Sequence, residues 1–218
     1  MAEMRTEEEQ IEAIKHWWKR NGTSLLIGIG AALIIVFGWQ AWQNRQAEQR
    51  TLAASEFASL LSALNTDDKE KRMDTVKYTV SQLQDKYEDS AYALYGTLIL
   101  AKQQLLEQDK ADAAIESLKW AQSRVEEGSA LAPIVRHRLA QAELSAGKYD
   151  DALSTVRGAS KSDSFDAMFA ELEGDILMAK GDREGAVAAY RKASEANSMN
   201  RNGVLELKMS DLAIGEDA

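Results

Sequence analysis

The residues that most often carry chemistry are scarce in this sequence. It has no cysteine, and its 218 residues include only two histidines, His16 and His137. The absence of cysteine excludes disulfides, thiolate metal sites and a cysteine nucleophile. His16 stands among basic and aromatic residues, which favours a membrane-interface position over a ligand role. A lone histidine at position 137 predicts a polar contact rather than a catalyst.

One stretch, GDREG at residues 181–185, has the composition of a cation-binding loop. It lacks the acidic spacing of an EF-hand, so we interpret Asp182 as a helix cap. Phosphate-binding loops, GxSxG elbows and HExxH motifs are also missing from the sequence. We therefore expect that the protein is not an enzyme and that it binds neither a cofactor nor a metal.

The composition predicts an acidic, all-α protein. The net charge is −9, and the chain has a single proline. Residues 1–22 hold five acidic and four basic residues, so most of the negative charge belongs to the remainder. Nucleic-acid binding needs a basic patch, and none is visible, so we expect no nucleic-acid partner. Alanine, leucine, glutamine and lysine recur, as they do in helices.

A long uncharged segment predicts a membrane anchor. The 24 positions from 21 to 44 contain no Asp, Glu, Lys or Arg, and about 20 apolar residues are enough to span a bilayer as a helix. Tryptophan pairs lie at both ends of this segment, as at membrane–water interfaces. We predict a retained transmembrane helix over residues 23–44, from Thr23 to Asn44. A cleaved signal peptide is the weaker alternative, because no small-residue cleavage site follows.

The orientation of the anchor follows from its flanking charges. More basic residues precede the span than follow it, and the side with the excess stays in the cytoplasm. The preceding ones are Arg5, Lys15, Lys19 and Arg20, and the following ones are Arg45 and Arg50. We expect residues 1–22 to form an amphipathic cytoplasmic tail helix that ends at Asn21-Gly22. Residues 45–218 then lie outside the cytoplasm.

Two segments of the outer part repeat one pattern without gaps. They are RLAQAELSAGKYDDALSTVRGA, residues 138–159, and LEGDILMAKGDREGAVAAYRKA, residues 172–193. Their turn glycines, Gly147 and Gly181, are 34 residues apart, which is the tetratricopeptide period. The pattern predicts antiparallel helix pairs that cross closely at small residues. These are Ala140 and Gly174 on the first helices, and Ala152, Ala159, Ala186 and Ala193 on the second. Val156 and Tyr190 occupy the larger position, where we expect them to fill the space toward the next repeat.

A more degenerate unit precedes the two repeats, with Asp109 at its turn and Ala114, Leu118 and Ala121 in the pattern. Further upstream, apolar residues at helical spacing predict two more helices. The first face holds Phe57, Leu60, Leu61 and Leu64, and the second holds Met73, Val76, Val80, Leu83 and Tyr87. A last helix is expected to cap the stack, with Val204, Leu207 and Leu212 inward. We expect about nine helices after the anchor and no sheet, an α-solenoid of tetratricopeptide-like pairs.

Stacked helix pairs bind partners on the concave surface that the first helix of each pair lines. With repeats starting at Tyr95, Pro133 and Ala167, the sequence predicts a mixed apolar and polar groove, suited to a peptide or an unfolded stretch. Some of its members are core residues if the register is imperfect. The groove residues are Ile99, Gln103, Leu106, His137, Gln141, Leu144, Met168, Glu171, Asp175 and Met178.

The order and spacing of several segments resemble the YfgM family over nearly the whole chain. The segments are EEQIEAIKHWWKRNG, LLIGIGAALIIVFGWQAW, SAYALYGTLILAK, RLAQAEL, GDILMAKGDREGAVAAYRKA and LELKMSDLA. The resemblance implies a single-span inner-membrane protein of Gram-negative bacteria with a periplasmic tetratricopeptide-like domain. It also implies an ancillary subunit of the SecYEG translocon that works beside a membrane-anchored prolyl isomerase. The cytoplasmic tail is linked, by the same resemblance, to control of an envelope-stress response.

The residues alone leave alternatives open. The leading hypothesis is a translocon-associated chaperone or adaptor that binds the isomerase or emerging chains. One alternative is a scaffold for another envelope assembly, in cell-wall synthesis or division, and another is a regulator that acts through the tail. The sequence leaves open the oligomeric state. It also leaves open whether a terminal segment of the same chain occupies the groove.

Overall fold

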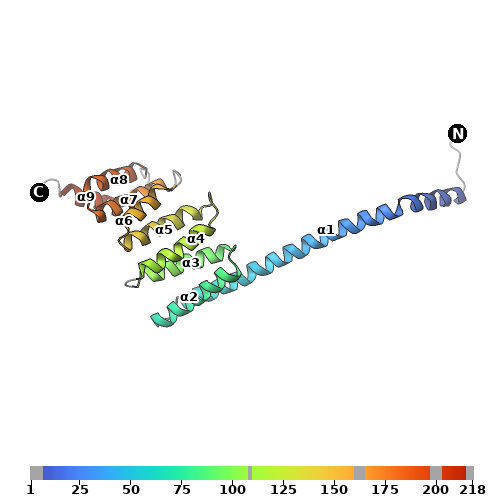
Figure 1. Ribbon diagram of the computed structural model, residues 1–218, viewed down its shortest axis with the longest axis horizontal. Coiled ribbons are helices and arrows are strands. Elements are labelled where there is room, and N and C mark those ends of the chain that lie inside the picture. Colours follow the sequence, from blue (N-terminus) through green and yellow to red (C-terminus); the bar gives the residue numbers. More distant parts are fainter. Residues whose placement is uncertain (1–6, 108–109, 160–164, 197–202, 215–218) are drawn as a thin grey trace. The chain divides into compact units, whose positions relative to one another are not determined.

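The computed structural model describes residues 7–107, 110–159, 165–196 and 203–214 (Figure 1). These residues form nine α-helices and no strand, which confirms the all-α prediction. The helices are α1 (Glu7–Ala63), α2 (Lys69–Lys86), α3 (Ala91–Leu105), α4 (Ala111–Arg124), α5 (Leu131–Ser145), α6 (Tyr149–Arg157), α7 (Asp166–Lys180), α8 (Arg183–Ala196) and α9 (Gly203–Ile214).

The chain divides into two compact units, Met1–Leu52 and Ala53–Ala218. In the first unit, α1 exposes apolar side chains on all its faces, from Leu25 to Phe37. The rings of Trp39 and Trp42 lie 5.0 Å apart just beyond them. Of the helices described, α1 is the one that is long and apolar enough to cross a membrane.

The predicted end of the tail helix at Asn21-Gly22 is wrong, because α1 continues through both residues. The side-chain amide of Asn21 donates to the carbonyl oxygen of Trp17 at 3.2 Å. Gly22 lies under the ring of Trp18, where an added Cβ would be 3.2 Å from ring carbons. Both residues are therefore accommodated inside the helix and do not act as its cap.

The second unit starts with the C-terminal part of α1. Leu60 and Ala63 are buried in one cluster with Met73 and Val76 of α2, and Phe57 packs against it. Leu61, which we placed on the same face, is 44% exposed. After α1 the described residues contain eight helices where we expected about nine, because the first helix of this unit is the end of α1 itself.

Helices α3 to α8 form antiparallel pairs that follow one another in chain order: α3 with α4, α5 with α6, and α7 with α8 (Figure 1). The first pair begins at Ala91, four residues before the predicted start at Tyr95. The predicted turn glycines are confirmed, because Gly147 and Gly181 have φ angles of 72° and 90°. Only a residue without Cβ adopts this left-handed conformation readily.

Both turns share one hydrogen-bond pattern. The N–H of Lys148 donates to the carbonyl oxygen of Glu143 at 2.9 Å, and the N–H of Asp182 donates to that of Leu177 at 2.9 Å. These are the long bonds of a Schellman motif, which satisfies the last carbonyl groups of a helix. Asp182 also accepts from the N–H of Gly185 at 2.9 Å, so the GDREG segment caps α8 as predicted.

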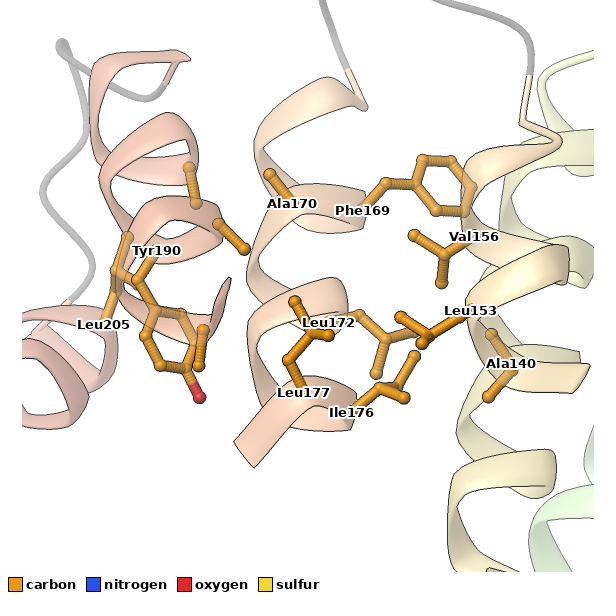
Figure 2. Packing of buried hydrophobic residues seen from close by; sticks show 14 of the residues in the cluster. Ala140, Leu153, Val156, Phe169, Ala170, Leu172, Ile176, Leu177, Tyr190 and Leu205 are labelled. Carbon is orange, nitrogen blue, oxygen red and sulfur yellow. The ribbon is translucent and has the colours of Figure 1, made fainter. Parts of the chain in front are cut away.

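Five of the six predicted small residues are buried between the helices, and Ala159 is only partly buried. Ala140, Ala152, Ala186 and Ala193 are fully buried. In the degenerate unit, Ala114, Leu118 and Ala121 are also fully buried, while Asp109 lies outside the described residues. Figure 2 shows α7 between Leu153 and Val156 on one side and Tyr190 and Leu205 on the other. The largest core cluster therefore joins α5 to α9 through α7.

The inward face of α9 differs from our prediction. Leu205 and Leu212 are buried at 5% and 3% exposure, whereas Val204 and Leu207 are 55% and 66% exposed. Residues 205 and 212 are seven positions apart and share a face, and positions 204 and 207 lie on an adjoining face. The prediction was therefore correct for Leu212 and wrong for Val204 and Leu207.

Candidate binding surface

The ten predicted groove residues lie on or directly after α3, α5 and α7, and none of them is fully buried. Leu106 and Met178 are the most open, at 71% and 38% exposure. Ile99 packs partly against the cluster around Leu60, so it is in part a core residue. Leu144 and Met168 pack partly against the large cluster, in the same way. The groove assignment of the ten residues therefore stays a prediction.

Three of the ten predicted residues come together between neighbouring first helices. Glu171 and Asp175 lie one helical turn apart on α7, and their charges act on His137 of α5. Gln103 lies on α3 and Leu106 directly follows it, and neither has a described contact with this group. Gln141 is engaged locally, since its side-chain oxygen accepts from Arg138 Nη1 at 2.8 Å.

The two carboxylates hold a lysine of the last helix. Lys208 Nζ lies 2.9 Å from Glu171 Oε1 and 2.7 Å from Asp175 Oδ1. Tyr190 Oη of α8 donates to the same Asp175 oxygen at 2.8 Å, and Lys208 Nζ also lies 5.8 Å from the centre of the Tyr190 ring. The C-terminal helix thus meets α7 through a charged contact in addition to its leucines.

This arrangement changes the proton affinity of its members. Burial lowers the pKa of Lys208, but hydrogen bonds to Asp175 and Glu171 outweigh that effect and raise it. Burial raises the pKa of Tyr190, and its hydrogen bond to Asp175 adds to the rise. At neutral pH the lysine is therefore charged and the phenol keeps its proton.

His137 is neutral at the same surface. Burial and the neighbouring charge of Arg138 lower its pKa to about 4, although Glu171 and Asp175 pull in the other direction. Its ring meets the ring of Phe169 edge-on, with centroids 5.9 Å apart. We predicted a polar contact for this residue, but the contact that the structure shows is aromatic packing, so His137 contributes an aromatic edge to the surface and no charge.

Our reading of the sequence missed two members of this group, Tyr190 and Lys208. We assigned Tyr190 to spacing between repeats, but its ring lies over Gly174 of its own helix pair. Lys208 carried a usable signal, since it stands between Leu205 and Leu212 on one helical face. A lysine at the centre of an apolar face needs an acidic partner.

The chain is similar to a known protein family and to several named proteins. The family described as tetratricopeptide repeat-like domain matches residues 15–214. A protein of Haemophilus influenzae named ancillary SecYEG translocon subunit is 32% identical, over 94% of this chain and 97% of that protein. Proteins with the same name from Neisseria gonorrhoeae and Escherichia coli are 26% and 22% identical, each over at least 95% of this chain.

These matches confirm the resemblance to the YfgM family. The family match includes most of the long apolar helix and all the helix pairs. The chain belongs to the family of tetratricopeptide repeat-like proteins that includes the ancillary SecYEG translocon subunits.

Proposed function

We propose that this protein is a single-pass inner-membrane subunit that accompanies the SecYEG translocon and binds other proteins through its helix pairs. The observation that carries the proposal is the relation to ancillary SecYEG translocon subunits over 94% of the chain. The apolar helix α1 supports a membrane location. The excess of basic residues before the span favours a cytoplasmic N-terminus and a periplasmic repeat domain.

The physical benefit of such an arrangement is local concentration. A binding surface anchored beside a channel meets each emerging segment at an effective concentration far above that of a free protein. The first helices α3, α5 and α7 offer half-buried apolar side chains with polar groups between them. A mixed surface of this kind binds helices and extended peptides without ATP or chemical catalysis.

Two kinds of partner fit this surface. One is the membrane-anchored prolyl isomerase that the YfgM resemblance implies, and the other is an unfolded chain that emerges from the translocon. We further propose that the cytoplasmic tail, residues 1–22, carries any link to the envelope-stress response. Deletion of residues 1–20 should then change stress signalling and leave binding by the outer domain intact.

The translocon assignment is tested by purification from membranes in mild detergent. The full chain, carrying an affinity tag after Ala218, should retain SecYEG at a constant ratio. A chain whose residues 23–44 are replaced by an unrelated transmembrane helix provides the control for the anchor. Recovery of cell-wall or division proteins without SecYEG would favour a scaffold for another envelope assembly.

The surface itself is tested by photocrosslinking in intact membranes. A photoreactive amino acid at Leu144 or Met178 should yield adducts with protein partners. The matched control is Tyr78 of α2, which is 66% exposed and outside the predicted groove. Equal labelling from all three positions, or adducts with lipid alone, would contradict the proposed groove.

A further inference from the structure

The last helix presents a simple recognition pattern to the rest of the protein. Leu205 and Leu212 enter the large apolar cluster, and Lys208 stands between them. The spacing of three and four residues places all of them on one face of a helix. The pattern is therefore leucine, lysine and leucine along one stripe of α9.

The surface that receives this stripe is specific for a cation. Glu171 and Asp175 present two carboxylates to one ammonium group, and Tyr190 orients the second carboxylate by its hydrogen bond. The side chains of Lys208, Glu171 and Asp175 are 29%, 22% and 30% exposed, so solvent screens the contact only in part. With two acids and one lysine, the site attracts positive charge even when it is occupied.

Several features make α9 a replaceable occupant. It is the last described helix, so it can leave without disturbing the order of α3 to α8. It has 12 residues, a length at which an isolated helix is marginal in water. A hydrogen bond of 2.5 Å from Arg183 Nη2 to the carbonyl oxygen of Leu212 also holds α9, and Met209 packs partly against the large cluster.

We propose that the surface around Glu171, Asp175 and Tyr190 is a docking site for an amphipathic partner helix that carries a lysine between two large aliphatic residues. In the free protein α9 occupies this site, and a partner helix of the same chemistry displaces it. The inference rests on the proposed function, because it specifies which helices the repeat domain accepts. Charge complementarity selects the partner. Because α9 competes for the same site, only a partner helix that binds more tightly than α9 can displace it.

The experiment uses the full chain in lipid nanodiscs and a fluorescent synthetic peptide with the sequence of residues 203–214. The Lys208→Glu variant repels α9 from the acidic pair but leaves Glu171 and Asp175 in place. We expect it to bind the peptide at least tenfold more tightly than the unaltered chain. A peptide with glutamate at the lysine position should not bind either protein.

Matched variants separate the site from general loosening of the fold. Lys77 is an exposed lysine of α2, and Lys77→Glu should bind the peptide as weakly as the unaltered chain. The triple variant Lys208→Glu, Glu171→Gln, Asp175→Asn should bind the peptide at least tenfold more weakly than Lys208→Glu alone. Lys208→Met, which keeps an aliphatic stem without charge, replaces Lys208→Glu if the latter does not fold.

Hydrogen exchange shows whether α9 has been released. Faster exchange confined to α9 in Lys208→Glu, together with tighter peptide binding, is the expected result. Unchanged exchange in α9, or release of α9 without a gain in peptide affinity, would overturn the proposal. Mass photometry adds one further outcome: if unaltered chains form dimers that Lys208→Glu dissolves, α9 is exchanged between two copies and the partner helix is rejected.

The failure of this inference is distinguishable from failure of the proposed function. If SecYEG co-purifies with Lys208→Glu but the peptide does not bind, only the docking site is wrong. If the peptide binds as expected and SecYEG never co-purifies, the docking site holds and the translocon assignment is wrong.

Discussion

The ring of Tyr190 lies directly against the backbone of Gly174, where a Cβ atom would be 2.3 Å from the ring carbon Cε1. The two residues belong to the paired helices α7 and α8, and Gly174 is buried. This approach brings Tyr190 Oη to Asp175 and so connects the packing of the pair to the charged contact with α9.

The Gly174→Ala substitution should therefore destabilise the repeat domain, although alanine normally favours a helix. The added methyl group forces the buried ring aside, and overpacking of this kind costs about 1–3 kcal/mol. Urea unfolding followed by circular dichroism would measure the loss. Gly203→Ala, where no atom lies within 4 Å of the added carbon, is the control and should be nearly neutral.

A second substitution tests the cause of that effect. If the clash with the ring is responsible, Gly174→Ala combined with Tyr190→Leu should be less destabilised than the sum of the two single variants. Strict additivity of the two changes would contradict the proposed contact.

Glu143 is a buried acid whose removal should stabilise the protein. It is 5% exposed on α5, and its Oε2 has no hydrogen-bond partner among the described residues. Burial raises its pKa, and a hydrogen bond from Thr155 offsets the rise only in part. Glu143→Gln removes the cost of a buried charge, so the free energy of unfolding at pH 8 should rise by about 1 kcal/mol.

The dependence of the Glu143 effect on pH has a definite sign. The folded state holds this proton to a higher pH than the unfolded state, whose carboxyl titrates near 4.5. Stability therefore falls as pH rises above 4.5, and Glu143→Gln lacks this component. The advantage of the variant should grow from pH 4.5 to pH 8 in thermal melts. Glu195→Gln, at an exposed position on α8, should show no such growth.

His137 should lower the stability of the domain as pH falls, whereas Glu143 lowers it as pH rises. Its pKa is lowered from 6.5 to about 4, so the unfolded state takes up a proton first as pH falls. The free energy of unfolding then decreases below pH 6.5, by about 1 kcal/mol at pH 5.5. His137→Gln should show a shallower loss of stability between pH 7.5 and 5.5. Parallel stability curves for the two proteins would refute this account of His137.

The proposed orientation can be tested because the sequence contains no cysteine. Single substitutions Ala13→Cys and Ser194→Cys place one thiol before the span and one on the exposed surface of α8. A membrane-impermeant maleimide should label Ser194→Cys in intact spheroplasts, and Ala13→Cys only after permeabilisation. The reverse pattern would contradict a periplasmic repeat domain.

Most of the fold could be predicted from local pattern. Gly147 and Gly181 have the left-handed φ angles that their position between helices required. Ala140, Ala152, Ala186 and Ala193 are fully buried, whereas Ala159 of the same pattern is only partly buried. These features depend on residues close in the sequence, or on a 34-residue period, and both are visible without a structure. The predicted break at Asn21-Gly22 failed because bonding and ring packing inside the helix replaced the cap.

The candidate site was only partly predictable, for a physical reason. Glu171 and Asp175 followed from the helical period of α7, but their partner Lys208 is 37 and 33 residues away in sequence. No local rule determines which face of a terminal helix turns inward, and the exposed Val204 and Leu207 show that apolar character alone does not decide it. The sequence by itself determined the helices, their turns and the apolar span. Only the tertiary structure decided that α9 rests on the acidic pair, because the pairing of distant charges depends on how whole helices pack.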